Sequence, residues 1–302
     1  MLVVAALGGN ALLRRSEPLD VGVQRRNVFD AVTSAIAPLA RKHQLVITHG
    51  NGPQIGLLAL QTAAYKSVAP YPLDVLSAES EGMVGYLIEQ ALANELRGSD
   101  VATLLTQVEV DSSDPAFARP TKPIGPIFDE PAAGELASRT SWTFMPDGEG
   151  YRRSVPSPEP RRIHGTGVIK LLVNAGVIVV CAGGGGIPVV ADSNGALHGV
   201  EAVIDKDLSA ALLAEEIGAG ALLLLTDVAA VWSQWPMTSA HPIHRATPAE
   251  LRRLKLAPGT MGPKAEAACR FAERTGRFAA IGALNQAEAV LDGRAGTTVK
   301  LT

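Results

Sequence analysis

The sequence has few aromatic residues, little net charge and no long apolar run. Aromatic residues make up 4% of the 302 residues, and the formal net charge is −3 with a pI near 6.1. A stacking surface for single-stranded nucleic acid and a basic field for a polyanion are therefore not expected. No apolar stretch reaches about 18 residues and no positively charged leader precedes the first apolar run, so we expect a cytoplasmic protein without a membrane partner.

Cysteine is also scarce. The two cysteines are Cys181, in an apolar run, and Cys269, in a helical pattern. Their spacing fits no zinc motif, and two thiols do not make a disulfide framework. We expect both to be reduced core residues, and we expect no metal site built from cysteine.

Two common nucleotide-binding signatures are missing. No G-x-x-x-x-G-K-[ST] string occurs, and neither Gly8 nor the glycine cluster 183–186 completes G-x-G-x-x-G with an acidic residue about 20 positions later. These absences argue against a P-loop NTPase and against a Rossmann-type dehydrogenase. Any phosphate site must therefore be assembled from separate loops.

Short apolar runs alternate with longer segments of helical spacing along most of the chain. This alternation predicts an α/β fold with a parallel sheet. Pro38 is expected to bend the helix 24–43 near its end, and Gly218 is expected to end the helix 208–217. The expected strands are 2–7, 45–48, 101–106, 177–181 and 221–226, and the expected helices are 24–43, 55–65, 79–97, 208–217 and 264–275.

The segment 112–162 interrupts this alternation with many prolines, glycines and charged residues. A structureless loop of this length is improbable inside a compact domain. We therefore predict an inserted, partly independent subdomain or lid that carries Trp142, Phe144 and Tyr151. A plain linker is the alternative.

Three glycine-rich turns follow expected strands. They are Gly8-Gly9-Asn10, Gly50-Asn51-Gly52 and the cluster 183–186. The backbone N–H groups of such turns can approach an anion closely, and ligands of open α/β sheets bind at this carboxyl edge. The alternative for each turn is a glycine needed only for a positive φ. Three turns together favour phosphate binding.

Lysine is rare, with 8 lysines among 27 basic residues, and two lysines lie in turns. Lys206 lies between Asp205 and Asp207 at the start of a helical pattern, and Lys264 follows a Gly-Pro pair. An ammonium group is a compact charge that can follow a moving phosphoryl group. Either aspartate can cap the helix. The functional alternative is that one carboxylate orients nearby lysines and reduces their mutual repulsion.

Five other polar residues carry weaker signals. Lys122, in the irregular segment, is either a lid cation that reaches a second substrate or a solvated loop lysine. Asp227 follows an expected strand and either borders a nucleotide or begins a turn. We assign His49 no role, and we interpret Glu79 and Glu81 as first-turn acids that favour a helix macrodipole.

Eight strings in a fixed order carry a family resemblance. They are Ala6-Leu-Gly-Gly-Asn-Ala-Leu12, Thr48-His-Gly-Asn-Gly-Pro-Gln54, Ala78-Glu-Ser-Glu-Gly-Met83, Thr121-Lys-Pro-Ile-Gly125, Val155-Pro-Ser-Pro-Glu-Pro160, Cys181-Ala-Gly-Gly-Gly-Gly-Ile-Pro188, Val200-Glu-Ala-Val-Ile-Asp-Lys-Asp207 and Met261-Gly-Pro-Lys264. Together they closely resemble the carbamate kinases of the amino acid kinase superfamily, over essentially the whole chain. The fourth and fifth strings distinguish this family from acetylglutamate, uridylate and aspartate kinases.

The resemblance implies a three-layer α/β/α sandwich with a mainly parallel central sheet, two lobes and a small protruding subdomain. The N-terminal lobe, 1–217, would bind carbamoyl phosphate or carbamate and contain the protruding subdomain at about 112–162. The C-terminal lobe, 218–302, would bind the nucleotide. The implied reaction is reversible phosphoryl transfer between carbamoyl phosphate and ADP, which gives ATP and carbamate with Mg²⁺ as cofactor. The implied partners are these small molecules and a second copy of the chain in a homodimer.

The resemblance also implies roles for individual residues. The residues that would hold the carbamoyl phosphate are Gly8, Gly9, Asn10, Gly50, Asn51 and Gly52. The residues that would act in catalysis are Lys122, Lys206, Asp207 and Lys264, with Lys122 reaching in from the protruding subdomain and Asp207 orienting the lysines. The residues that would line the nucleotide site are Lys206, Thr226, Asp227, Met261 and Lys264.

The chain departs from the family mainly at the expected adenine site. The family usually has Asp and Tyr where this chain has Ala229 and Trp232, although Trp still offers a flat wall for a purine. Two other functions stay open. One is a carboxylate kinase for a larger acyl substrate, against which Lys122 and the insertion argue. The other is a non-catalytic nucleotide sensor, against which retention of the lysines argues.

Overall fold

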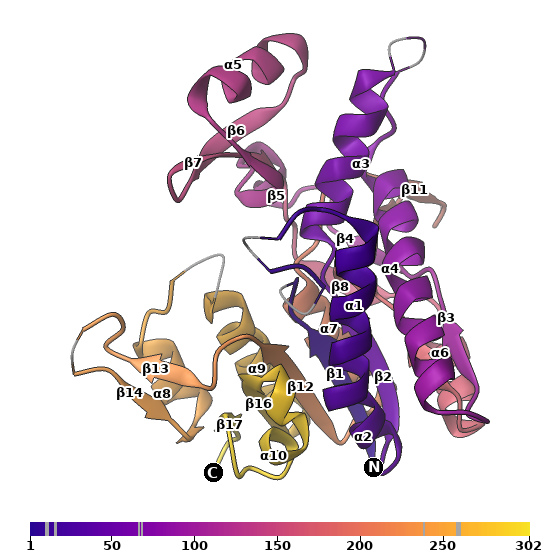
Figure 1. The fold of residues 1–302 in the computed structure, drawn as a ribbon, viewed down its shortest axis with the longest axis vertical. Helices are drawn as coiled ribbons and strands as arrows, with labels where there is room; N and C mark the ends of the chain where they lie inside the picture. Colours follow the sequence, from indigo (N-terminus) through magenta and orange to yellow (C-terminus); the bar gives the residue numbers. More distant parts are fainter. Residues whose placement is uncertain (10–11, 15–16, 66, 68, 238, 258–260) are drawn as a thin grey trace.

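The computed structural model describes all residues except 10–11, 15–16, 66, 68, 238 and 258–260. Among the described residues, an eight-stranded sheet forms the centre of the molecule, in the order β15-β17-β16-β12-β1-β2-β9-β3 (Figure 1). The strands are β1 (Leu2–Leu7), β2 (Gln44–His49), β3 (Val101–Thr103), β9 (Ile178–Val180), β12 (Ala221–Thr226), β15 (Arg245–Ala246), β16 (Phe278–Ala283) and β17 (Thr297–Val299).

The five expected strands are neighbours in this sheet and all run parallel. Strand β1 lies between β2 and β12, with Val3 opposite Leu45 on one side and Ala221 on the other. Residues 3–7 of β1 are all buried. Parallel strands that are covered on both faces read as continuous apolar runs, and this explains why the sequence revealed them. Strands β3 and β9 are shorter than expected.

Helices cover both faces of the sheet. Val4 and Ala6 of β1 face a core that contains residues of α6 (Thr166–Asn174), α7 (Lys206–Ile217) and α9 (Met261–Thr275). Val3 and Ala5 face a second core that contains residues of α1 (Val21–Ala31), α2 (Ala37–Ala40), α4 (Leu73–Glu95) and α10 (Ala287–Leu291). The predicted fold class, a three-layer α/β/α sandwich with a mainly parallel sheet, is confirmed.

The helix expected at 24–43 is irregular near its end. It consists of α1, a π-helical segment Val32–Ile36 and α2, and the N–H of Ala37 bonds to the carbonyl of Val32. Pro38 has no N–H and its ring clashes with the carbonyl four residues earlier in a regular helix. The widened turn before Pro38 avoids that clash, so the predicted bend takes the form of a π-helical segment.

Helix α4 begins at Leu73, well before the expected start at residue 79. Pro72 occupies the N-cap position and makes no side-chain cap, so the sequence gives no capping signal there. The interpretation of Glu79 and Glu81 as first-turn acids is therefore wrong, because both lie inside the helix and Glu81 is buried. Gly218 ends α7 in the left-handed conformation at φ 76°, as predicted.

The segment 112–162 contains a small antiparallel sheet in the order β5-β7-β6 and one α-helix. Its elements are β5 (Lys122–Phe128), α5 (Glu130–Arg139), β6 (Thr143–Asp147) and β7 (Gly150–Val155). Figure 1 shows β5, β6, β7 and α5 standing away from the central sheet. The chain returns through β8 (Pro160–Ile163), which joins β4 (Gln107–Val110), β10 (Ile187–Ala191) and β11 (Leu197–Gly199) in a second sheet.

The protruding subdomain is attached to the main body by tight contacts. Gly56 of α3 (Gly52–Ala64) lies against Gly125 of β5 so closely that a Cβ on Gly56 would be 1.9 Å from the Cα of Gly125. Arg153 of β7 lies 3.9 Å from the ring centre of Trp142 and donates to Glu201 at 3.2 Å. These contacts hold the start of β5 in place against the main body. The first residue of β5 is Lys122.

The C-terminal part of the chain contains elements that the sequence patterns did not reveal. Besides β15, β16, β17 and α10, these include the hairpin of β13 (Val231–Ser233) and β14 (His241–Ile243) and the helix α8 (Pro248–Arg253). Both cysteines are free and buried, as expected. In the part of the chain that the structure describes, no helix has the length and apolar character needed to cross a bilayer.

Candidate active site

The glycine turns after β1 and β2 meet at the carboxyl edge of the sheet. A Cβ on Gly50 would lie 3.1 Å from the Cα of Gly9 and 3.8 Å from the Cδ of Lys206. A Cβ on Gly8 would lie 3.1 Å from the carbonyl oxygen of Leu225, at the end of β12. Backbones from three neighbouring strands therefore approach one another here, beside the first residue of α7.

The glycines of these turns serve different physical needs. In the third turn, Gly184 and its two successors have positive φ values, which explains glycine there. The described glycines of the first two turns have no positive φ, and among them Gly8 and Gly50 lie so close to neighbouring backbone that a Cβ would be tightly packed. Among the described residues, no atom lies within 4 Å of where a Cβ on Gly9 or Gly52 would be. The described part of the chain therefore leaves the backbone at these two glycines uncovered.

Two lysines from different helices share one carboxylate. Lys206 Nζ donates to Asp207 Oδ1, and Lys264 Nζ donates to Asp207 Oδ2 at 2.9 Å. The exposed fractions of the three side chains are 11%, 13% and 5% for Lys206, Lys264 and Asp207. Helix α7 supplies the first lysine and helix α9 the second, and the structure brings both ammonium groups to the same place.

A third lysine reaches this place from the protruding subdomain. Lys122 Nζ donates to Asp205 Oδ2 at 3.0 Å, and the lysine side chain is 23% exposed. Asp205 is also the N-cap of α7, because its Oδ1 accepts from the N–H groups of Asp207 at 2.9 Å and Leu208 at 3.3 Å. The two aspartates have separate tasks: Asp205 caps the helix and binds Lys122, whereas Asp207 binds the other two lysines.

The charges in this cluster perturb one another strongly. Burial alone raises the pKa of Asp207, but the charges of Lys206 and Lys264 outweigh it and hold the pKa well below its usual range. The pKa of Asp205 is lowered in the same way, since Lys122 outweighs burial. Burial lowers the pKa of Lys206, whereas Asp207 raises that of Lys264 despite its burial. Three ammonium groups facing two ionised carboxylates attract an anion.

The residues predicted for the nucleotide lie next to this cluster. Thr226 ends β12, and its Cα is 3.6 Å from where a Cβ on Gly8 would be. Thr226 Oγ1 donates to Asp227 Oδ1 at 3.1 Å, and the charge of Asp227 raises the pKa of Lys264. Met261 begins α9 and packs against the core. Asn10, predicted for the first glycine turn, lies outside the described residues.

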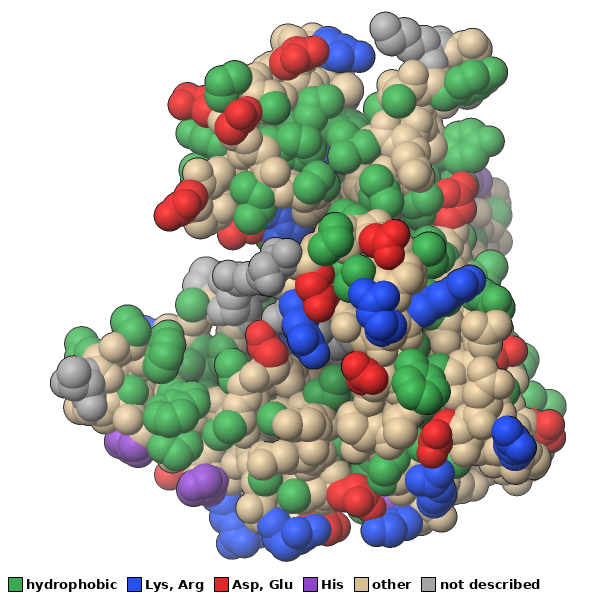
Figure 2. Space-filling view, viewed as in Figure 1, with side chains coloured by type: hydrophobic (Ala, Val, Ile, Leu, Met, Phe, Trp, Pro, Cys, Tyr) green, Lys and Arg blue, Asp and Glu red, His purple; other side chains and the backbone are tan. Residues whose placement is uncertain are grey.

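An aromatic surface lies on the β13–β14 hairpin. The ring centre of Trp232 is 6.3 Å from that of Trp235, which is 73% exposed, and Met237 is 68% exposed. Figure 2 shows apolar side chains over this hairpin and an indentation of the same face between the hairpin and the protruding subdomain. The chain therefore offers an exposed apolar surface, formed in part by two tilted indole rings, close in sequence to Thr226 and Asp227.

Asn51 and three residues to which the sequence gave no role in the site hold the glycine turns in place. Asn51, predicted to contact carbamoyl phosphate, is 3% exposed, and its Nδ2 donates to Ser80 Oγ of α4 at 2.8 Å. Glu81 of α4 accepts from the third glycine turn, and Ser209 of α7 donates to it. The string Ala78-Glu-Ser-Glu-Gly-Met83 was a signal for Glu81, but the wrong helix start concealed its position.

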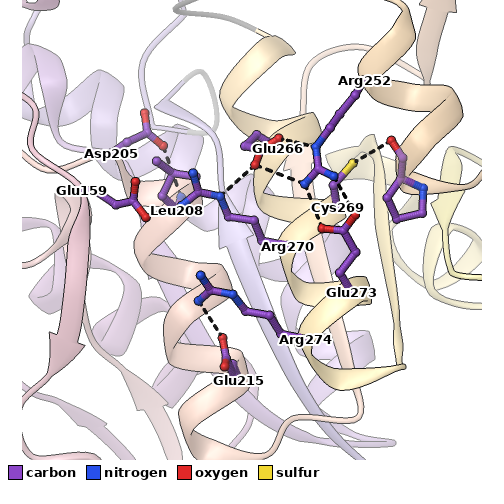
Figure 3. A network of polar contacts seen from close by, with 11 residues as sticks. Glu159, Asp205, Leu208, Glu215, Arg252, Glu266, Cys269, Arg270, Glu273 and Arg274 are labelled. Carbon is purple, nitrogen blue, oxygen red and sulfur yellow. Dashed lines mark hydrogen bonds and ion pairs between the residues drawn. The ribbon is translucent and has the colours of Figure 1, made fainter.

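Helix α9 is tied to the N-terminal part of the chain by a network of ion pairs (Figure 3). Arg270 Nη1 donates to Glu159 Oε1 at 2.7 Å, and Arg270 Nε donates to Glu266 Oε1 at 2.8 Å. Arg252 of α8 extends the network to Glu266 and to Glu273. Glu159 belongs to the Pro-Ser-Pro-Glu-Pro string, so this string contacts the helix that carries Lys264.

Comparisons with known proteins show the family of this chain. A sequence profile of the amino acid kinase family matches residues 1–282. A carbamate kinase of Rhizobium meliloti (strain 1021) is 51% identical over 302 residues, which is 99% of this chain and 93% of that protein. A carbamate kinase of Haemophilus influenzae is also 51% identical, over 99% of this chain and 96% of that protein.

Solved structures lead to the same family. The carbamate kinase from Giardia lamblia bound to AMP-PNP has a TM-score of 0.90 to this chain at 38% identity, covering 100% of this chain and 98% of that one. The chain therefore belongs to the amino acid kinase family and, within it, to the carbamate kinases. It is an enzyme, and because its relatives are kinases a nucleotide is one of its substrates.

Proposed function

We propose that the protein transfers a phosphoryl group reversibly between carbamoyl phosphate and ADP, giving ATP and carbamate. The observation that carries the proposal is the meeting of Lys206 and Lys264 at Asp207, beside two glycine turns, in a member of the carbamate kinases. The AMP-PNP complex of the Giardia lamblia enzyme supports a nucleotide site in the shared fold.

The two substrates would approach the lysine cluster from different lobes. Carbamoyl phosphate would bind the N-terminal lobe, 1–217, where the described part of the chain leaves the backbone at Gly9 and Gly52 uncovered and α3 points its N-terminus at the anion. The nucleotide would bind the C-terminal lobe, 218–302. There Thr226, Asp227 and Met261 would border its phosphates and sugar, and the ring of Trp232 would face the purine.

The chemistry requires alignment and positive charge more than a covalent catalyst. The bond between phosphorus and the carbamoyl oxygen breaks, a β-phosphate oxygen of ADP forms the new bond, and carbamate leaves as an anion. The loose transition state spreads charge over the equatorial oxygens. Lys206 and Lys264 would donate to these oxygens while Asp207 orients them, and Lys122 would neutralise the carbamoyl phosphate side. The attacking oxygen is already ionised, so no general base is needed.

Mg²⁺ would be held mainly by the phosphates of the nucleotide. The described residues include no group of three or more His, Cys, Asp or Glu side chains arranged to hold a metal ion. Asp205 and Asp207 are bonded to lysines. Coordination mainly by nucleotide phosphates suits Mg²⁺, which commonly binds one or two carboxylates together with water and substrate phosphates. When bound, it would neutralise part of the phosphate charge.

Two parts of the proposal rest on the family and on composition rather than on the site. We propose that the protein is a homodimer and that it acts in the cytoplasm, where its two free cysteines stay reduced. Light scattering after gel filtration measures the mass directly. A mass of one chain, 31.4 kDa, would contradict the dimer.

The decisive experiment is the initial rate of ATP formation from ADP and carbamoyl phosphate in a coupled assay. The wild-type protein is expected to turn over, and Lys206→Ala is expected to lose at least about 100-fold in kcat because transition-state stabilisation is removed. Thermal unfolding should change little, since Lys264 still pairs with Asp207. Lys42→Ala, a change of an exposed lysine, is the control.

Alternative substrates separate the related functions. Larger acyl phosphates, tested beside carbamoyl phosphate, distinguish a carboxylate kinase from the proposed enzyme. A wild-type protein that binds ADP but forms no ATP with any of them would be a nucleotide sensor. Either result would overturn the proposal, as would near-native turnover of the Lys206→Ala variant.

A further inference from the structure

Glu81 has a buried carboxyl group for which the proposed chemistry has no use. It lies inside α4, and the residue is 1% exposed. Oε1 accepts from the backbone N–H of Gly183 at 2.8 Å, and Oε2 accepts from the backbone N–H of Thr106 at 3.1 Å. Buried backbone N–H groups require an acceptor, and one side chain here serves two loops that follow different strands, β9 and β3.

The loop 183–186 has almost no freedom to move between its neighbours. A Cβ on Gly183 would lie 2.2 Å from Nε2 of His49, and a Cβ on Gly184 would lie 2.1 Å from Nδ2 of Asn51. His49 is the last residue of β2, and Asn51 belongs to the glycine turn that follows it. A displacement of the loop 183–186 would therefore displace the turn that contains Gly50.

The same loop also contacts the helix that carries the lysine. Ser209 Oγ of α7 donates to the carbonyl of Gly185 at 2.8 Å, and Ser209 is fully buried. Ser209 lies less than one turn from Lys206. The contacts thus run from Glu81 through the loop 183–186 to the first turn of α7. On the other side they run to the turn at Gly50, where an added Cβ would lie 3.8 Å from the Cδ of Lys206.

We propose that Glu81 is a positioning residue for phosphoryl transfer, because its carboxyl group fixes the loop 183–186 and through this loop the distance between Lys206 and the carbamoyl phosphate turn. This inference rests on the proposed function. Glu81 contacts no substrate in this account. Its neighbour Ser80 does the same for the turn after β2, since it accepts from Asn51, so two consecutive residues of α4 support two of the three glycine turns.

The test compares Glu81→Gln with Glu79→Gln, its matched control. The amide of Gln keeps one acceptor and turns an NH₂ group toward a backbone N–H that needs an acceptor. Glu79 lies on the same helix but is exposed, so its change leaves the loop intact. We expect Glu81→Gln to lower kcat/KM for carbamoyl phosphate roughly 10- to 100-fold, the effect of leaving one buried backbone N–H without an acceptor. The Kd for ADP should stay within about twofold of wild type in both variants.

A second variant guards against a folding defect in the first. Ser209→Ala removes only a hydroxyl and should lower the same kcat/KM. Because both residues act through one loop, the double variant should lose less than the product of the single losses. Hydrogen exchange gives a readout without activity: the amides of Gly183 and Thr106 should exchange faster in Glu81→Gln than in Glu79→Gln.

The outcomes separate this inference from the proposed function. A wild-type protein that forms no ATP would overturn the proposed function. An active wild type with an unchanged Glu81→Gln variant would overturn the positioning role of Glu81. So would a variant in which ADP affinity falls as much as carbamoyl phosphate turnover, since that pattern indicates a general loss of structure.

Discussion

At the scale of single residues, Asp207 stabilises the lysine cluster when no ligand is bound. Its two oxygens separate two buried ammonium groups that would otherwise face each other. Like charges in a buried place destabilise a protein unless an opposite charge is present. Asp207 therefore stabilises the protein when no ligand is bound. When the lysines bind phosphate, its carboxylate is a counter-charge beside them.

Asp207→Asn tests this stabilising role. Asn can accept from only one lysine, so one ammonium group stays buried without a partner. We expect the free energy of unfolding to fall by about 3–5 kcal/mol and ATP formation to fall at least about 100-fold. Urea denaturation and initial rates measure the two effects. Glu288→Gln, which removes the exposed pair with Lys42, should change stability by less than about 1 kcal/mol. Equal stability of both variants would contradict the prediction.

The pH dependence of stability provides a separate test at Glu81. Burial raises the pKa of Glu81 from 4.5 to about 8 and lowers the pKa of the adjacent His49 from 6.5 to about 4. A carboxyl group with a raised pKa stabilises the folded state at low pH and loses that contribution as the pH rises through the folded value. The lowered pKa of His49 costs stability only below 6.5. Between pH 6.5 and 8, Glu81 is therefore the one of these two residues that changes the free energy of unfolding with pH.

In that range the unfolding free energy of the wild type should fall relative to Glu81→Gln, which cannot ionise. Denaturant unfolding at several pH values measures the difference. Glu79→Gln should follow the wild type at every pH, because Glu79 is exposed. Parallel curves for the wild type and Glu81→Gln would show that Glu81 has an ordinary pKa.

At the scale of elements, the contact between α3 and β5 sets the position of Lys122. Gly56→Ala would place a Cβ 1.9 Å from the Cα of Gly125, so β5 must move and Lys122 must withdraw from Asp205. We expect kcat to fall roughly tenfold or more, the scale of a lost charge-assisted hydrogen bond. Gly134→Ala, inside α5 and next to open space, is the control and should raise stability by about 1 kcal/mol without affecting kcat. A fully active Gly56→Ala variant would contradict this account.

The elements also show which features a single sequence can reveal. The five central strands were predictable because burial on both faces makes them continuous apolar runs. Strands β15 and β17 were not, since two or three residues hold no periodic pattern. The start of α4 was misplaced because Pro72 offers no cap, and that error concealed the burial of Glu81. The glycine turns and Lys206 were recognisable from local sequence, whereas the pair of Lys122 with Asp205 joins residues far apart in the chain.

At the scale of the whole molecule, the contact between Arg270 and Glu159 links the two predicted lobes close to Lys264. Glu159→Gln should raise the KM for ADP roughly 3- to 5-fold, the upper end of the range expected for a partly exposed ion pair. Glu215→Gln, which breaks the pair with Arg274 farther along α9, is the control and should stay within about twofold. Steady-state kinetics with varied ADP measures both. Equal effects would mean that distance from Lys264 along α9 is irrelevant.

The dual role of Asp205 has a consequence for the empty and loaded enzyme. One oxygen of Asp205 caps helix α7, and the other accepts a hydrogen bond from Lys122 of the protruding subdomain. Docking of the subdomain and formation of the first turn of α7 are therefore thermodynamically coupled. Such coupling is reciprocal. A ligand that breaks the bond between Lys122 and Asp205 must destabilise the first turn of α7. The free energy lost there equals the free energy by which the capped turn stabilises docking of the subdomain. Release of the product would restore both interactions.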